Sequence, residues 1–591
     1  MTMETSRPDA LLKAGIAHHA AGRAAEAESA YRAVLAAHPG HPDALHLLGV
    51  LALHHGRPDL AARLIGESIR HDPGNPAGFS NLARALHRLG QLGQARTSAR
   101  VALALDPGFL DGFNTLADIL SERGEHGATA DALSRVLALS PWLTEPRLKR
   151  AHALLLAGRN EDAVETLMTL LGMTPLSVAG YTNMGVALRR LGRLEEAIAA
   201  YRSALGFSSG EPGTLNNLGI TFQDVGRYEE AAACFRLSIA GQPDGSHAHL
   251  NLGLVARDEM RVDESITLAR RAATLEPALA EAHTALGHGL LLKGELREGF
   301  AEYEWRSRMA DFPSPRRDFA SPVWDGSSLA GRTLLVHDEQ GVGDTIMFAR
   351  YAALLQTHGA RVFLDCNAQL VRLLSSMPGI SGVVPRYESP PPHDFHVALA
   401  SLPHRLRATL YTIPAPLAYL KAEPALVESW RARLGSRRGL RIGLIWAGNP
   451  EFKGDRLRSP GLAAFRPLLD LPGVSVYGLQ KGAGRRDLER CGPLPTSFVD
   501  LGADIADFAD TAAIMDSLDL VVSSCTGPAH LAGALGRPTW TVLPFAPDWR
   551  WLEHGVCTPW YPSMRLFRQE RRGDWSAVVA RLCGMLEGLT G

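Results

Sequence analysis

The sequence lacks several features that would each point to a particular class of protein. Lys and Arg number 61 and Asp and Glu 62, so no excess of charge favours nucleic acid or an anionic membrane as a partner. No apolar run approaches the length of a membrane span. The polar segment Met1–Ala10 has no apolar centre of the kind that a signal peptide needs. We therefore expect a cytoplasmic protein with no membrane span and no nucleic acid partner.

Cysteine pairs and nucleotide-hydrolysis motifs are also missing. The six cysteines occur without a C-x-x-C pair, which argues against a disulfide scaffold or a zinc knuckle. The sequence contains no Walker A motif and no cluster of His and Cys, so neither hydrolysis of a nucleoside triphosphate nor a bound metal is expected.

The first half of the chain carries a strict internal repeat. A small residue recurs every 34 residues without insertion, at Gly15, Gly49, Ala83, Ala117, Ala151, Gly185, Gly219, Gly253 and Gly287. A second small residue follows twelve residues later in each unit, and a proline ends most units. This pattern is typical of the tetratricopeptide repeat (TPR). It predicts an α-solenoid of about nine helix pairs over residues 8–306, with the first helix of each pair on the concave side.

One position of the repeat carries amide side chains. The residues two before the small residue include Asn81, Asn183, Asn217 and Asn251, with Thr115 in register. An amide donates and accepts hydrogen bonds, so a row of amides can hold a peptide backbone without reading its sequence. The row resembles the asparagine ladder of TPR-containing O-GlcNAc transferases, which implies binding of an acceptor peptide. The alternative is that Asn is tolerated there on a solvated helix face.

The second half predicts an α/β fold. The periodicity stops after Arg306, and residues 307–331 are predicted to be a connector. Strand and helix patterns then alternate, which predicts parallel sheets in two lobes, 332–421 and 439–591, joined by a linker at 422–438. We expect strands at 333–337, 361–366, 383–384, 396–399, 441–446, 474–479, 520–523 and 539–543. The main helices are expected at 344–358, 368–377, 508–518, 529–535 and 575–589.

Two strand–turn–helix segments are rich in glycine. One spans Val336–Thr345 and the other Leu520–Gly536. A helix N-terminus after a strand offers unpaired N–H groups and a partial positive charge, which suit a phosphate. His530 adds a possible side-chain donor one turn into the second helix. An ordinary β–α turn is the alternative for the second segment.

Four segments together resemble a known family. They are residues 341–350, 446–453, 479–482 and 526–535, and they are similar to the heptosyltransferase-like (family 9-type) glycosyltransferases. The similarity covers roughly 330–591 and is greatest to the bacterial subset with N-terminal TPRs, some of which modify flagellin. It implies a GT-B-like pair of doubly wound lobes. The N-terminal lobe would face the acceptor, the C-terminal lobe would bind a nucleotide-sugar co-substrate, and no cofactor is implied. The sequence has no Asp-x-Asp, so a metal-dependent GT-A site is not expected.

The resemblance also implies roles for individual residues. Asp344 lies where the family has its proposed base, although it could instead only cap its helix. The residues expected near the donor or its phosphate are Gly341, Gly343, Asn449, Lys453, Arg458, Gln480, Lys481, Asp507, Thr511, Thr526, Gly527 and His530. One position departs from the family, because Cys525 stands where an Asp is usual. Either the donor differs from a nucleotide-heptose or activity is reduced.

These observations lead to one expected function and two alternatives. The expected function is a protein O-glycosyltransferase, whose repeats recruit a polypeptide such as flagellin and whose α/β lobes transfer a sugar to Ser or Thr. The first alternative is a non-catalytic interaction scaffold with degenerate transferase lobes, which Cys525 favours. The second is a transferase acting on lipopolysaccharide or another glycan, which would not need so long a peptide-binding array.

Overall fold

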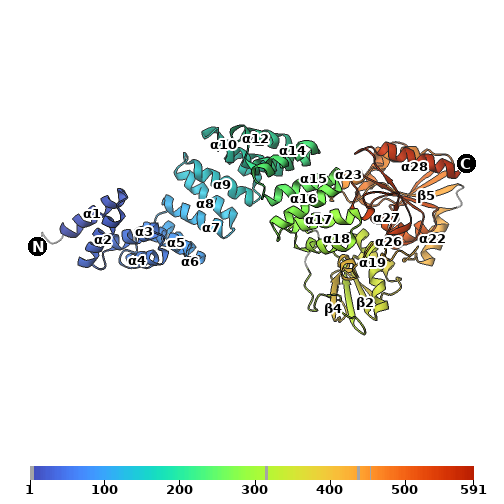
Figure 1. The fold of residues 1–591 in the computed structure, drawn as a ribbon, viewed down its shortest axis with the longest axis horizontal. Helices are drawn as coiled ribbons and strands as arrows, with labels where there is room; N and C mark the ends of the chain where they lie inside the picture. The colour runs from blue at the N-terminus through green and yellow to red at the C-terminus, as the bar shows by residue number, and fades with distance from the viewer. Residues whose placement is uncertain (1–5, 313, 315–316, 436–438, 453, 591) are drawn as a thin grey trace. The chain divides into compact units, whose positions relative to one another are not determined.

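The structure, a computed structural model, describes every residue except 1–5, 313, 315–316, 436–438, 453 and 591 (Figure 1). The chain forms a helical solenoid followed by a region with parallel sheets. By its contacts it divides into two compact units, residues 1–243 and 244–591. Among the described residues, no helix combines the length and the apolar character needed to cross a membrane.

The first unit consists of antiparallel helix pairs. Its helices are α1 (Ser6–Ala20), α2 (Ala24–Ala37), α3 (Pro42–His54), α4 (Pro58–His71), α5 (Pro76–Arg88), α6 (Leu92–Leu105), α7 (Leu110–Glu122), α8 (His126–Leu139), α9 (Thr144–Leu156), α10 (Asn160–Met173), α11 (Val178–Arg190), α12 (Leu194–Phe207), α13 (Pro212–Asp224) and α14 (Tyr228–Gly241). The helix pairs confirm the predicted 34-residue units.

The small residues of the repeat allow the two helices of a pair to touch. A Cβ added at Gly15 or Gly219 would lie 2.6 Å from the ring of Tyr31 or Phe235, which is closer than real Cβ atoms come. The turn between the two helices needs a positive φ. Glycine supplies it in most repeats, whereas Met260 adopts φ 59° in the eighth repeat. The periodic residues are therefore explained by packing and backbone geometry.

The second unit begins with the last two repeats. These are α15 (Ser246–Asp258), α16 (Val262–Leu275), α17 (Ala280–Lys293) and α18 (Leu296–Tyr303), and a short 3₁₀ helix η1 (Glu304–Arg308) follows. Their apolar side chains belong to the same core as the α/β region: the Phe300 ring packs edge-on against Phe348 and Trp549, with centroids 6.2 and 5.6 Å apart. The array predicted over 8–306 therefore crosses the division between the two units.

The first sheet is parallel, with strand order β3-β2-β1-β4. Its strands are β1 (Thr333–His337), β2 (Arg361–Cys366), β3 (Gly382–Pro385) and β4 (Phe395–Ala398), each within a residue or two of the predicted range. Helices α19 (Val342–Leu355), α20 (Ala368–Leu374) and α21 (Leu402–Arg405), with η2 (Gln356–His358) and η3 (Leu399–Ser401), complete this lobe. Helix α19 begins two residues before the predicted start, because Gly341 caps it.

The second sheet has the order β10-β11-β9-β8-β5-β6-β7, and only the β10–β11 pair is antiparallel. Its strands are β5 (Leu440–Ile445), β6 (Val474–Gly478), β7 (Phe498–Asp500), β8 (Leu520–Ser524), β9 (Thr539–Leu543), β10 (Cys557–Thr558) and β11 (Tyr561–Arg568). The longer helices of this lobe are α26 (Phe508–Asp516), α27 (Gly527–Ala534) and α28 (Trp575–Thr590). The short elements between them are α23 (Asp455–Arg458), η4 (Leu462–Phe465), α24 (Arg466–Leu469), η5 (Gly482–Arg486), α25 (Asp487–Arg490) and η6 (Trp549–Trp551).

The predicted linker contains a helix. Helix α22 (Pro424–Leu434) occupies much of 422–438, and residues 436–438 lie outside the described part of the chain. Its buried face includes Val427 and Trp430, and the Trp430 indole donates to Asp510 at 2.9 Å. The connection between the lobes therefore packs against α26 as a structural element.

Candidate functional site

The topology of the second sheet marks one place for a ligand. From β5 the chain moves to β6 and β7 on one side, and then crosses to β8 and β9 on the other. Parallel α/β sheets bind ligands where the strand order reverses, beyond the carboxyl ends of the two strands concerned. Here those strands are β5 and β8, which are hydrogen-bonded neighbours. The loop after β5 and the turn Cys525–Gly527 therefore form the candidate donor site.

A charged pair lies at this point. The Arg458 guanidinium donates to Asp455 at 3.1 Å and reaches the Cys525 carbonyl at 3.5 Å. A Cβ added at Gly448 would lie 2.9 Å from the Arg458 guanidinium and 3.1 Å from the Thr526 methyl group. The predicted residues Arg458 and Thr526 are thus brought together, and Asp455 joins them.

Other predicted donor residues are engaged within the protein. The Gln480 amide accepts from the backbone N–H groups of Trp446 and Ala447 at 3.1 and 2.9 Å, so it holds the loop after β5. The Lys481 ammonium donates to backbone carbonyls at Ile505 and Ala506. Both side chains therefore hold backbone segments of this lobe in place.

Three further predicted residues have local partners, and one lies outside the described residues. Asp507 caps α26 by accepting from Ala509 and Asp510 N–H groups at 2.8 and 3.1 Å, and the Thr511 hydroxyl donates to the Asp507 carbonyl at 3.2 Å. Asn449 accepts from the Glu451 N–H at 3.2 Å. Lys453 is the residue that the structure does not describe.

The two glycine-rich turns meet directly. A Cβ at Gly343 would lie 3.0 Å from the His530 ring and 3.2 Å from the Gly527 Cα, so the N-terminal ends of α19 and α27 are in contact. His530 is only 5% exposed; its ring stacks on Trp551 and its Nδ1 lies 2.9 Å from the Tyr561 hydroxyl. Burial lowers the pKa of His530 to about 3, so the imidazole is neutral at pH 7. As placed, it joins the two lobes as a packed aromatic ring.

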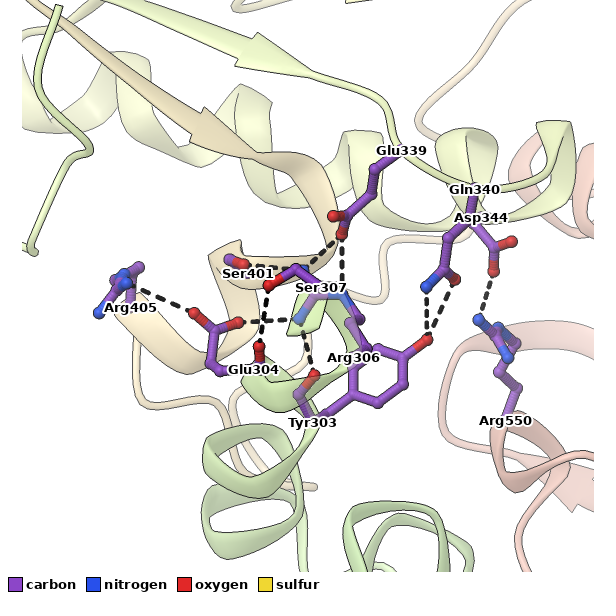
Figure 2. A network of polar contacts seen from close by, with 10 residues as sticks. All are labelled: Tyr303, Glu304, Arg306, Ser307, Glu339, Gln340, Asp344, Ser401, Arg405 and Arg550. Atoms are coloured by element: carbon purple, nitrogen blue, oxygen red, sulfur yellow. Dashed lines mark hydrogen bonds and ion pairs between the residues drawn. The ribbon is translucent and has the colours of Figure 1, made fainter. Parts of the chain in front are cut away.

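Asp344 has two hydrogen-bond partners, and Figure 2 shows one of them, Arg550. Its Oδ2 accepts from the Gly341 N–H at 3.1 Å, and its Oδ1 accepts from the Arg550 guanidinium. Arg550 also donates to Asp548 at 2.7 Å. Burial alone would lower the pKa of Arg550, but Asp344 and Asp548 raise it. The Asp344 side chain remains 23% exposed, so it stays partly accessible beside a buried cation.

Cys525 is buried beside the same site. It is 7% exposed, and burial raises the pKa of its thiol to about 12. The Cys525 thiol is therefore neutral at pH 7.

The asparagine positions differ from one another in their surroundings. The Asn81 amide lies 2.9 Å from His46, whereas the half-buried Asn183 and Asn217 have no side-chain hydrogen bond to another described residue. Asn251 lies on α15 in the second unit. Between Thr115 and Asn183 the row is interrupted by Lys149, which pairs with Asp118 at 3.4 Å. Asn183 and Asn217, on α11 and α13, are therefore the best placed for a peptide.

The structure adds two exposed apolar residues that the sequence analysis missed. Trp142 and Leu176 are 69% and 71% exposed, and Leu176 lines a groove of about 510 Å³ together with Leu148, Leu170 and Pro175. Trp142 and Leu176 directly follow the unit-ending prolines Pro141 and Pro175. Other repeats carry a small or polar residue at this position, namely Gly40, Gly74, Gly108, Gly210, Asp244 and Ala278. That contrast is the sequence signal that would have found them.

Comparisons with known proteins agree with the helical array. A family model described as tetratricopeptide repeat matches residues 12–76, 52–109, 148–212 and 216–280. Protein FlbA of Caulobacter vibrioides is 29% identical over 331 residues, which are 50% of this chain and 53% of FlbA. The chain thus spans about half the length of this curated relative.

Solved structures also resemble parts of the chain. YrrB, described as a TPR protein with an unusual peptide-binding site, is 18% identical and covers 32% of this chain and 96% of its own, with a TM-score of 0.29. MamA is 22% identical and covers 28% of this chain and 97% of its own, with a TM-score of 0.26. On the family match and the helix pairs, the helical array of this chain is an array of tetratricopeptide repeats, a scaffold for protein–protein interaction.

Proposed function

We propose that this protein is a glycosyltransferase that modifies a polypeptide held by its repeats. The proposal rests on the contact between two glycine-rich helix N-termini, those of α19 and α27, each of which follows a parallel strand of a different sheet. Asp344 directly follows Gly343, the residue that contacts Gly527. A GT-B-like transferase needs this arrangement, because the acceptor and the activated sugar come from opposite lobes.

The residues at the junction have complementary roles in such a transfer. The acceptor hydroxyl of Ser or Thr attacks the anomeric carbon, the bond from that carbon to the phosphate oxygen breaks, and the nucleotide leaves with the electron pair. Asp344 would take the hydroxyl proton. The N-terminal end of α27 and Arg458 would face the negative charge that develops on the leaving phosphate.

The repeats would supply the acceptor. Asn183 and Asn217 offer amide groups that have no side-chain partner among the described residues, and Trp142 and Leu176 offer apolar anchors. Flagellin is a candidate acceptor because the similar bacterial transferases include enzymes that modify it. A peptide held in this way would be recruited through both backbone and apolar contacts.

Binding of the donor can be tested without knowing the acceptor. A panel of nucleotide sugars and their nucleoside diphosphates is added to the full chain, and the melting temperature is followed, because a ligand of the native state raises it. We expect one nucleotide class to raise the melting temperature of the wild type and to raise it less in Arg458→Ala. No shift with any member of the panel would contradict the proposal.

A non-catalytic scaffold is the second candidate. It is favoured by the neutral Cys525 thiol in place of a carboxylate and by the burial of His530, which removes a cation from the phosphate site. This candidate predicts acceptor binding without donor binding. Measuring both on the same preparation therefore separates the two candidates.

A further inference from the structure

The end of the repeat array enters the α/β region at a specific place. Helix α18 is short and turns into η1, which ends at Arg308. Arg306 on η1 is only 3% exposed, and all five of its N–H groups are used. They donate to the Glu339 carboxylate twice, to Ser401 at 2.8 Å, to the Tyr303 carbonyl at 2.9 Å and to Glu304 at 3.0 Å (Figure 2).

Two of these partners mark the switch point of the first sheet. The chain passes from β1 to β2 and β3 on one side and returns to β4 on the other. Glu339 follows the carboxyl end of β1, and Ser401 follows the carboxyl end of β4. A parallel sheet offers this crevice to a ligand. In this chain the Arg306 guanidinium lies at this position, between Glu339 and Ser401.

A second contact from the same repeat holds Gln340, the residue after Glu339. The Tyr303 hydroxyl lies 3.0 Å from the Gln340 Oε1 and 2.7 Å from its Nε2. Tyr303 is 4% exposed, and burial raises the pKa of its hydroxyl. Gln340 directly precedes Gly341, the residue that caps α19 and donates to Asp344. Glu339 and Gln340 are thus both held by the ninth repeat, immediately before the turn that carries Asp344.

We infer that Tyr303 and Arg306 are positioning residues of the proposed transferase site: the last repeat fixes the turn 339–344 and thereby the Asp344 carboxylate. This inference rests on the proposed function and deepens it, because it makes the ninth repeat a part of the catalytic module. The repeats then have two roles. The earlier repeats bind the acceptor, and the last one sets the geometry of the site.

The clearest test uses Tyr303→Phe, which keeps the ring in the core and removes only the hydroxyl. We expect hydrogen exchange of the backbone amides in 339–345 to increase while the melting temperature changes little. Turnover should fall by about 10-fold or more, because small displacements of a reacting group are costly, and the KM for the nucleotide sugar should stay within about twofold. A residue that only stabilises the fold would lower the melting temperature and leave turnover per folded molecule unchanged.

Arg306→Ala provides a second test through chemical rescue. The variant leaves a guanidinium-shaped space beside Glu339 and Ser401, so guanidinium or ethylguanidinium at millimolar concentration should restore slow exchange in 339–345 and restore turnover. Arg306→Lys should not restore them, because an ammonium cannot reproduce the five-donor fork. Arg405→Ala is the matched control, since Arg405 touches Glu304 at 3.4 Å but does not contact the turn.

The readouts separate failure of this inference from failure of the proposed function. If the wild type transfers no sugar with any donor, the proposed function fails, and selective exchange in 339–345 of Tyr303→Phe still supports the positioning role. If exchange and turnover in Tyr303→Phe both match the wild type, the positioning role is overturned even when the enzyme is active.

Discussion

Replacing Asp344 by Asn separates a catalytic carboxylate from a structural one. Asp344 accepts one hydrogen bond from the Gly341 N–H at 3.1 Å and one from Arg550. Asn has the same size, and its carbonyl oxygen can still accept from Gly341. Its NH₂ group then faces the Arg550 guanidinium, so the second interaction becomes an unfavourable contact between two donors. The variant therefore removes the basic group and one charged hydrogen bond while the helix cap remains.

The cost in stability can be bounded from the structure. A hydrogen bond to a charged group contributes about 1.5–3 kcal/mol. Arg550 also donates to Asp548 at 2.7 Å and keeps this partner in the variant, and the Asp344 side chain is 23% exposed. We therefore expect Asp344→Asn to lower the unfolding free energy by about 2 kcal/mol. In a domain of this size the melting temperature should fall by at most about 4–8 °C. Turnover should fall by about 100-fold or more if Asp344 is the base.

The matched control is Asp548→Asn, which removes the other carboxylate of Arg550 and leaves Asp344 intact. Donor binding is followed by thermal shift and turnover by release of the nucleotide. We expect the two variants to lose similar stability, to bind the donor, and to differ in turnover by about 100-fold. Equal turnover in Asp344→Asn and Asp548→Asn would refute the assignment of Asp344 as base.

Three further predictions concern His530 and the repeats. Burial lowers the pKa of His530 to about 3, against 6.5 for the free side chain. The contribution of the neutral ring to stability is therefore complete above pH 6.5 and is lost as the pH falls toward 3. Between pH 6.5 and 5 the wild type should lose about 1.6 kcal/mol more unfolding free energy than His530→Gln in denaturant unfolding. An equal loss in the two proteins would contradict the buried neutral ring. Asn183→Ala combined with Asn217→Ala should weaken acceptor binding by about 10- to 100-fold in calorimetry with donor binding intact, and an unchanged acceptor affinity would argue against the ladder. Trp142→Ser combined with Leu176→Ser should change the unfolding free energy by less than about 0.5 kcal/mol, because both side chains are exposed. The same variant should bind the acceptor about 10-fold more weakly. Full acceptor affinity in this variant would exclude these two residues as acceptor contacts.

Much of the fold follows from the sequence because the packing that defines it is local. The contacts of Gly15 with Tyr31 and of Gly219 with Phe235 join residues 16 apart, so a periodic pattern records them directly. The strands β1, β2, β8 and β9 are buried apolar runs and were predicted within a residue or two. Strand β11 was missed because Pro562 and two arginines interrupt its apolar pattern, although β9 pairs with it in the sheet.

The site was less predictable because its contacts join distant segments. Asp344 and Arg550 are 206 residues apart, and Arg306 and Ser401 are 95 apart, so no spacing rule relates them. Gln480 lies two residues beyond the end of β6, beside the candidate site. The direction of its amide, however, depends on the backbone of Trp446 and Ala447, which a motif does not specify.

Transfer of a sugar to a protein is tested most directly by the intact mass of the acceptor. The full chain or its Asp344→Asn variant is co-expressed with a flagellin and a nucleotide-sugar pathway, and the flagellin is purified and weighed by mass spectrometry. We expect the flagellin mass to increase by one or more sugar residues with the wild type and to stay unchanged with Asp344→Asn. An unmodified acceptor with the wild type under every donor pathway, or an equal mass increase with the variant, would contradict it.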